Sequence, residues 1–214
     1  MNPWLALPLG DYEGHMQSPD VDQLVPLSDL FSDVLRRHRP ASVAILGIAG
    51  GNGLEHVDPS VTGRVVGLDV NPQYLDVTRR RFPDLRALEL HCADLAEATP
   101  AVPPVALVHA AMVFEHAGTG LCLDNALSLV APGGVLSTVL QLPSESAGAV
   151  GVTPFPSMET LASHFAFVDP VHLQRTLAER GWTLVHQRRL PLPSGKAFWS
   201  GAFVRAGSMP APRG

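Results

Sequence analysis

A glycine-rich turn is the first part of the sequence whose residue types and spacing could do chemistry. The stretch LGIAGGNGLEHV, residues 46–57, contains four glycines and an alanine and follows the apolar run SVAIL. Glycine residues between a strand and a helix let a nucleotide approach the backbone closely, and open α/β sheets bind ligands at the carboxyl ends of their strands. The turn therefore predicts a nucleotide-binding site.

Two common classes of nucleotide-binding protein do not match this turn. The phosphate-binding loop GxxxxGK[ST] needs a lysine directly after its last glycine, but the only lysine of the chain is the distant Lys196. Gly47, Gly51 and Gly53 do have the GxxxGxG spacing of short-chain dehydrogenases. Those enzymes also need a YxxxK pair, and here Leu192 stands four residues before the lysine. An NAD(P)-dependent oxidoreductase therefore remains only as an alternative.

Residues 40–142 resemble a class I S-adenosylmethionine (SAM)-dependent methyltransferase. ILGIAGGNG stands where that superfamily usually has a hydrophobic pair, an acid and a GxGxG turn, and Gly51, Asn52 and Gly53 fall at the end of this turn. Gly47 stands at the place of the acid, and Ala49 replaces the first glycine. Backbone carbonyls of the turn would then contact the methionine amino group. The resemblance implies SAM as the cofactor.

The resemblance also implies roles for two acids at the ends of strands. Asp69, followed by Val70, would accept hydrogen bonds from both ribose hydroxyls, because its two carboxylate oxygens can face two adjacent donors. Asp94 would accept from the adenine amino group, while the backbone amide of Leu95 faces a ring nitrogen. The alternatives are that Asp69 only caps the following helix and that Asp94 only belongs to a turn.

Two further features would complete the implied cofactor site. Ala110, at the end of the fourth strand, would leave room for the methyl donor, or it belongs to the ordinary core. The segment DYEGHM, residues 11–16, would cover the cofactor, with Tyr12 and Met16 as its apolar side chains. The alternative for this segment is a helix that packs on the sheet.

The chemistry of methyl transfer needs few protein groups. It is an in-line displacement at a sulfonium carbon, so alignment and exclusion of water can supply about 7 to 11 kcal/mol of the barrier. A base near the fourth strand would help with a phenol or a protonated nitrogen as acceptor. The resemblance places Glu115 and His116 there, and His15 is a third candidate; Glu115 and His116 could instead cap the turn before the next helix.

The elements that must position these residues are alternating strands and helices. Helices are expected over 71–82, with Asn71 as N-cap and Pro72 in the first turn, over 118–134 and over 169–181. Residues 182–206 form two runs joined by a PSG turn, which predicts a hairpin at the sheet edge. The predicted fold is α/β, a Rossmann-like three-layer sandwich with a seven-strand, mostly parallel sheet and an antiparallel C-terminal hairpin. The other strands are expected in SVAILG (42–47), RVVGLD (64–69), ALELHCAD (87–94), PVALVHAA (104–111) and GGVLSTVLQL (133–142).

One domain is expected, because 214 residues with 46% hydrophobic content can bury one good core. Residues 1–40 would form an N-terminal helical segment and cofactor lid, 41–206 the SAM-binding domain and 207–214 a disordered tail. Residues 143–165, rich in Ser, Pro and Gly, are long for a connection and are predicted to be a functional loop.

Composition limits the partners. The net charge of −5 argues against nucleic acid, and no apolar run approaches the roughly 18 residues of a membrane helix. Cys92 and Cys122 lack CxxC spacing and no HExxH pattern occurs, so we expect no disulfide, no metal site and a cytoplasmic protein. The sequence thus predicts a SAM-dependent methyltransferase acting on a small-molecule acceptor, with a non-catalytic protein that binds SAM or its demethylated product as the alternative.

Overall fold

The computed structural model describes residues 2–144 and 153–206, which form a seven-stranded sheet with the order β3-β2-β1-β4-β5-β7-β6. The predicted C-terminal tail, 207–214, lies outside the described residues. The strands are β1 (Ser42–Leu46), β2 (Arg64–Asp69), β3 (Leu88–Cys92), β4 (Val105–Ala111), β5 (Val130–Leu142), β6 (Trp182–Pro191) and β7 (Ala197–Arg205).

Strands β1 to β5 pair in parallel, whereas β7 pairs antiparallel with both β5 and β6. The predicted fold, including the antiparallel hairpin at the sheet edge, is therefore confirmed. Leu142 of β5 lies opposite Ala197 of β7. Because β7 runs against β5, its first residue lies at the same edge of the sheet as the carboxyl ends of the parallel strands.

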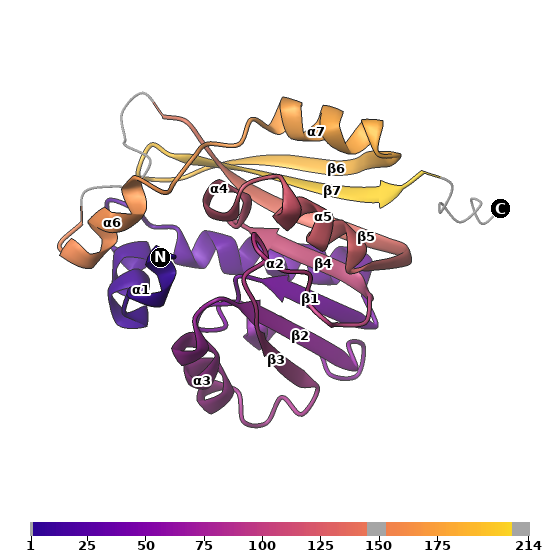
Figure 1. Ribbon diagram of the computed structural model, residues 1–214, viewed down its shortest axis with the longest axis horizontal. Helices are drawn as coiled ribbons and strands as arrows, with labels where there is room; N and C mark the ends of the chain where they lie inside the picture. The colour runs from indigo at the N-terminus through magenta and orange to yellow at the C-terminus, as the bar shows by residue number, and fades with distance from the viewer. Residues whose placement is uncertain (1, 145–152, 207–214) are drawn as a thin grey trace.

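Helices cover both faces of the sheet, with α5 in front of it and α2 behind it in Figure 1. Phe31 of α2 and Leu75 of α3 join one core cluster, while Leu123 of α5 and Leu177 of α7 join another on the opposite face. Both faces of the parallel strands are thus buried, as their continuous apolar runs indicate. The helices are α1 (Leu9–Gln17), α2 (Leu24–His38), α3 (Pro72–Arg81), α4 (Phe114–Ala117), α5 (Leu121–Ser128), α6 (Glu159–Ala162) and α7 (Pro170–Glu179), with single 3-10 turns η1 (Pro3–Leu5), η2 (Leu54–His56) and η3 (Pro156–Met158).

Two of the predicted helices begin and end close to their expected limits. The side chain of Asn71 accepts a hydrogen bond from the backbone N–H of Gln73 at 2.9 Å, and Asp169 caps α7 in the same way. The single helix predicted over 118–134 is wrong, because α5 ends at Ser128 and β5 already begins at Val130. Val130 pairs with Val105 of β4, so strand pairing competes with helix formation in a stretch that also contains proline and glycine.

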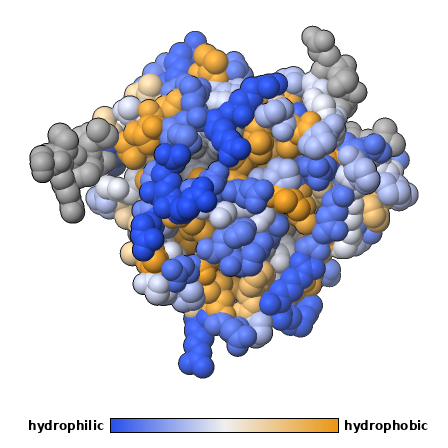
Figure 2. All heavy atoms as spheres, turned by 180° about the vertical axis from the view of Figure 1, so that it is seen from behind, coloured by the Kyte–Doolittle hydropathy of each residue, from blue (hydrophilic) through white to orange (hydrophobic). Residues whose placement is uncertain are grey.

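The face behind the sheet is mostly polar. Figure 2 shows hydrophilic side chains over most of this face, with smaller hydrophobic areas between them. Helix α2 is amphipathic, with Leu27, Leu30, Phe31 and Leu35 buried and its arginines outside. In the described part of the chain, no helix combines the length and apolarity that crossing a membrane requires.

Candidate functional site

A cavity of about 350 Å³ opens at the carboxyl ends of the parallel strands. The strand ends supply its floor, α1 and η1 cover one side, and the segment with η3 and α6 covers another. In Figure 1, α1 and α6 lie close to one another beside this edge of the sheet. The described part of the long loop predicted over 143–165 thus contributes to the cavity, whereas 145–152 lie outside the described residues.

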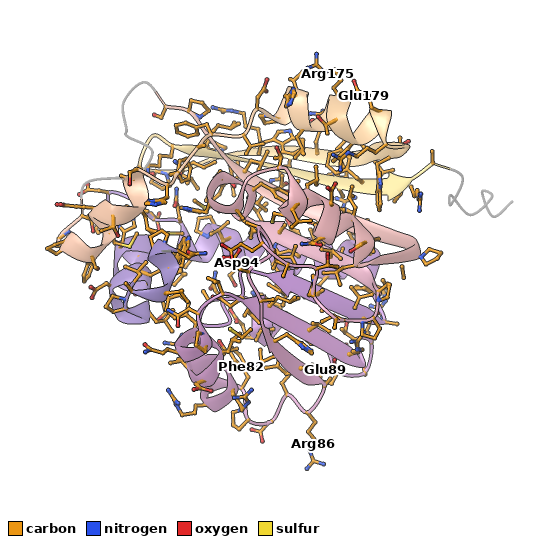
Figure 3. All side chains as sticks on the ribbon, in the orientation of Figure 1. Phe82, Arg86, Glu89, Asp94, Arg175 and Glu179 are labelled. Atoms are coloured by element: carbon orange, nitrogen blue, oxygen red, sulfur yellow. The ribbon has the colours of Figure 1, made fainter. Side chains whose placement is uncertain are left out.

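Most of the predicted site residues line this one cavity. They come from the N-terminal segment, from the turn after β1, from the ends of β2 and β3, and from α4: Tyr12, His15, Met16, Gly47, Ala49, Asp69, Val70, Asp94, Leu95 and His116. Figure 3 shows Asp94 near the middle of the view, after the end of β3. The strand-end residues meet because parallel strands end at one edge of the sheet, and the N-terminal segment and α4 meet them there.

Asp69 is held by backbone donors on both carboxylate oxygens. Oδ2 accepts from Ala49 N at 2.8 Å, and Oδ1 accepts from Asn71 N at 2.9 Å. Burial raises the pKa of the Asp69 carboxyl, and these backbone hydrogen bonds partly oppose that shift. The helix cap itself is Asn71, so Asp69 links the glycine turn to the end of β2 rather than serving as the cap of α3.

The second half of the glycine turn does not face the cavity. A Cβ atom at Gly51 would meet Phe82 at 2.6 Å, and one at Gly53 would meet Phe31 at 2.9 Å. Both glycines have positive φ and allow α2 and α3 to pack closely against the turn. Gly51, Asn52 and Gly53 are absent from the lining of the main cavity, so their expected place beside the ligand stays a prediction.

The side chain of Asn52 turns toward α2 instead. Its amide donates to the carbonyl oxygen of Leu24 at 2.8 Å, and it borders a smaller neighbouring cavity of about 60 Å³. Gly47 and Ala49, which do line the main cavity, both have positive φ, at 64° and 47°. The first half of the turn is therefore the part that presents its backbone to the cavity.

Two more predicted residues lie outside the cavity. Ala110 is fully buried in the sheet core, and its neighbour Ala111 lines the cavity instead. Glu115 Oε1 accepts from the backbone N–H of Gln141 at 2.8 Å, and the carbonyl oxygen of Glu115 accepts from Ala166 N. Glu115 therefore connects to the end of β5 and to the chain before α7, and its expected catalytic role stays a prediction.

Hydrogen bonds hold the N-terminal segment across the cavity. Asn2 donates to Asp94 Oδ2 at 2.8 Å, and Asn71 donates to the carbonyl oxygen of Trp4 at 2.8 Å. The ring of Trp4 meets Tyr12 edge-to-face at 5.4 Å between centroids and His116 at 4.9 Å. The sequence analysis predicted that residues 11–16 cover the cofactor, and in the structure η1 also lies over the cavity. The Trp within an apolar N-terminal patch was the sequence feature that could have indicated this.

Two of the cavity histidines are neutral at pH 7. Burial lowers the pKa of His15 to about 4, with a smaller contribution from the charge of Lys196. Burial likewise lowers the pKa of His116 to about 4, with the charge of His164 adding to the shift. The Nδ1 atoms of both rings are buried and have no hydrogen-bond partner within the described residues.

Comparison with solved structures identifies the architecture. N-methyltransferase NodS from Bradyrhizobium japonicum WM9, in complex with S-adenosyl-L-homocysteine (SAH), aligns with a TM-score of 0.60 at 19% identity, covering 94% of this chain and 88% of that chain. The DhpI–SAM–HEP complex aligns with a TM-score of 0.64 at 18% identity, covering 91% and 92%. The [4+2]-cyclase SpnF aligns with a TM-score of 0.63 at 10% identity, covering 83% and 80%.

The chain has the class I methyltransferase fold. No protein-family model and no curated protein matches the sequence. At these identities the similarity establishes the fold alone, and the reaction has to be argued from the cavity.

The methyltransferase fold also brings three residues to the cavity that the sequence analysis did not select. Gln23 precedes α2, Gln141 lies in β5 and Lys196 immediately precedes β7, yet all three line the same cavity. Gln23 Nε2 donates to Gln141 Oε1 at 2.7 Å across 118 positions of sequence. Lys196 was notable in the sequence as the only lysine, but the residues around it do not predict that it lies beside a site formed by β1 to β4.

Proposed function

We propose that this protein is a SAM-dependent methyltransferase that transfers a methyl group to a small-molecule acceptor. One observation carries the proposal: Asp69 and Asp94, at the ends of adjacent strands, line the same cavity as the backbone of Gly47 and Ala49. The cavity continues past β4 to the ends of β5 and β7. It therefore has space for an acceptor beyond the part that fits a nucleoside.

The residues present fit SAM as the cofactor. The carboxylate of Asp69 is suited to ribose hydroxyls, and that of Asp94 to an amino group. Gly47, with φ of 64°, presents bare backbone to the cavity. NodS was solved with SAH and DhpI with SAM, both in the same fold, which supports this choice of cofactor.

The contribution of the protein to the reaction would be mainly alignment and exclusion of water. SAM supplies a methyl group that its sulfonium charge has already activated. The N-terminal segment closes one side of the cavity through Asn2 and Trp4, and Met158, Leu161 and Phe165 close another. Holding two reactants in line in such an enclosure can contribute about 7 to 11 kcal/mol.

His116 is the favoured proton acceptor for an acceptor group that must lose a proton. Its ring lies between Trp4 and Phe165, at centroid distances of 4.9 and 5.2 Å. Burial lowers its pKa to about 4, so the imidazole is unprotonated near pH 7, although the same desolvation makes it a weak base. Glu115 is not among the residues that line the cavity, so His116 is better placed for this role.

A second candidate function is binding of SAM or SAH without methyl transfer. The observation that favours it is that the [4+2]-cyclase SpnF has the same fold, so the fold does not by itself imply methylation. In addition, glycine occupies position 47, where the superfamily usually has an acid. An NAD(P)-dependent oxidoreductase is the weaker alternative, because the chain lacks the YxxxK pair of short-chain dehydrogenases.

Isothermal titration calorimetry of the full chain with SAH, SAM and NADP tests the proposal. SAH and SAM should bind, and NADP should not; binding of NADP alone would contradict it. Asp69→Asn should weaken SAH binding about tenfold, because a charge-assisted acceptor is lost. The exposed Asp84→Asn is the matched control and should leave the affinity unchanged.

Transfer itself is tested with SAM that carries a deuterated methyl group. Incubation of the enzyme and this SAM with a small-molecule cell extract should yield a deuterium-labelled metabolite, detected by mass spectrometry. SAH binding without any labelled product would instead support the non-catalytic binding protein.

A further inference from the structure

A smaller cavity of about 60 Å³ adjoins the main one at the glycine turn. Four residues line both cavities: Tyr12, Gly47, Ala49 and Ala111. One of them, Ala49, donates its backbone N–H to Asp69 at 2.8 Å. The smaller cavity therefore lies directly beside the carboxylate that is proposed to bind the ribose.

The smaller cavity carries a negative charge. Among the described residues that line it, Glu13 of α1 is the one with a charged side chain. His109 also lines it, but burial lowers the pKa of this ring to about 4, so the ring is neutral at pH 7. The side chain of Glu13 is only 19% exposed. Its carboxylate is thus largely shielded from solvent and borders a cavity with no other charged lining residue in the described part of the chain.

An ion pair holds Glu13 against the glycine turn. Its Oε2 accepts from Arg81 Nη2 at 2.8 Å and its Oε1 accepts from Arg81 Nη1. Arg81 Nη1 also donates to the carbonyl oxygen of Gly50 at 3.2 Å. The pair joins α1 to the end of α3, and α1 lies above α3 in Figure 1. A Cβ atom at Gly50 would overlap both Glu13 Oε1 and Arg81 Nη1, so glycine at this position lets the pair lie on the turn.

The pairing with Arg81 leaves Glu13 able to bind a further cation. A carboxylate has about four acceptor sites on its two oxygens, and the two hydrogen bonds from Arg81 occupy two of them. The side chain of Arg81 is 43% exposed, so water screens its charge. A second cation can therefore approach Glu13 from the cavity while Arg81 stays in place on the other side.

From this arrangement we infer that the smaller cavity binds the amino-acid end of SAM and that Glu13 accepts a hydrogen bond from its ammonium group. This inference rests on the proposed function, because it concerns the cofactor of that reaction. A short thioether chain joins the amino-acid end of SAM to the ribose, so a ribose at Asp69 places this end at the junction of the two cavities. The ammonium then meets the carboxylate of opposite charge.

The backbone of the turn is less suited to this contact than the sequence analysis expected. The carbonyl oxygen of Ala49 already accepts from Thr78 Oγ1 at 2.6 Å, and that of Gly50 accepts from Arg81. These carbonyl oxygens therefore already have donors within the protein. A carboxylate also gives a stronger hydrogen bond to an ammonium group than a neutral carbonyl oxygen does.

Two adenosine analogues that differ only in the end of the tail test this contact in the wild-type chain. One is 5′-(3-aminopropylthio)-5′-deoxyadenosine, which keeps the ammonium group, and the other is its 3-hydroxypropylthio counterpart, which is neutral. Isothermal titration calorimetry should show that the amine binds at least about tenfold more tightly than the alcohol, because only the amine forms a charge-assisted hydrogen bond with Glu13. Equal affinities would overturn the inference.

The variant Glu13→Gln assigns the preference for the amine to this residue. It keeps the shape of the side chain and removes its charge, so it should remove the preference while the affinity for the alcohol stays within about twofold of the wild type. Glu179→Gln, at an exposed position of α7, is the matched control and should keep the full preference. A preference that persists in Glu13→Gln, or an equal loss of affinity for both analogues, would overturn the inference. If Glu13→Gln does not fold, the comparison of the two analogues on the wild-type chain decides the question.

The failure of this inference is distinguishable from failure of the proposed function. SAH binding to the wild-type chain is measured first, on the same preparation. If SAH binds but the amine and the alcohol bind equally, only the role of Glu13 is overturned and SAM remains the cofactor. If SAH does not bind, the proposed function fails and the inference fails with it.

Discussion

The side-chain amide of Asn2 donates to the carboxylate of Asp94 at 2.8 Å, although the two residues lie 92 positions apart. The other oxygen of Asp94 accepts from the backbone of Ala96 at 3.0 Å. Both oxygens of Asp94 are thus engaged, one of them by the very start of the chain. The carboxylate proposed to bind adenine therefore also anchors the segment that covers the cavity.

Comparison of two variants separates these two roles of Asp94. Asp94→Ala should weaken SAH binding about tenfold, because it removes a charged acceptor. Asn2→Ala keeps that acceptor and removes only the anchor, so its SAH affinity should stay within about threefold of the wild type. Both are measured by calorimetry. Equal losses in the two variants would show that the anchor matters and that Asp94 makes no important contact with the ligand.

Trp4 should report the binding of SAH by fluorescence. Its ring contacts His116 and Tyr12 at the edge of the cavity, so a bound ligand changes its surroundings. The emission of the wild-type protein should shift on SAH binding, and Trp4→Phe should abolish the shift although Trp182 and Trp199 remain. If calorimetry shows binding but the emission stays constant, the N-terminal segment does not meet the bound ligand.

Gly51→Ala should lower stability without lowering the affinity of the folded protein. The new Cβ would lie 2.6 Å from Phe82 Cε2, at a residue with φ of 86°. A strained backbone and a crowded contact together should lower the free energy of unfolding by about 1 to 3 kcal/mol. SAH affinity should stay within about twofold of the wild type. Gly63→Ala, with open space around its Cβ, is the control; a large loss of affinity in Gly51→Ala would place this glycine beside the ligand after all.

Glu115 should make the protein less stable as the pH rises through neutrality. Burial raises the pKa of this carboxyl from 4.5 to about 7, because the charged form is desolvated. The folded state therefore holds a proton more tightly than the unfolded state. The resulting stabilisation is complete below 4.5 and is lost as the pH rises through about 7, in total on the order of 3 kcal/mol.

Glu115→Gln removes this titration, so the fall in unfolding free energy between about pH 5 and about pH 8 should be smaller than in the wild type. Urea denaturation at the two pH values measures the difference. Glu179→Gln is the matched control, because Glu179 lies on the exposed side of α7 in Figure 3. Identical pH dependence in Glu115→Gln and the wild type would show that Glu115 stays charged in the folded protein.

The sequence by itself determined the strands, most of the helices, and the part of the site at the strand ends. Apolar, β-branched runs such as SVAIL indicate buried strands, and Asn71 with Pro72 specifies the start of α3, because these signals act over a few neighbouring residues. Since parallel strands end at one edge, Asp69 and Asp94 were predicted to meet there, and they line one cavity. The local pattern gave the wrong prediction for the second half of residues 118–134. There, pairing of Val130 with β4 makes the chain a strand and not a helix.

Only the tertiary structure decided which neighbours each of these residues meets. Gly51 and Gly53 have the expected spacing, yet they pack against Phe82 and Phe31 and do not line the main cavity. Lys196 reaches the cavity only because β7 inserts antiparallel beside β5, and Asn2 reaches Asp94 only because the N-terminal segment crosses the ends of β2 and β3. Such contacts join positions far apart in the chain. They follow from strand order and packing, which no short window of sequence encodes.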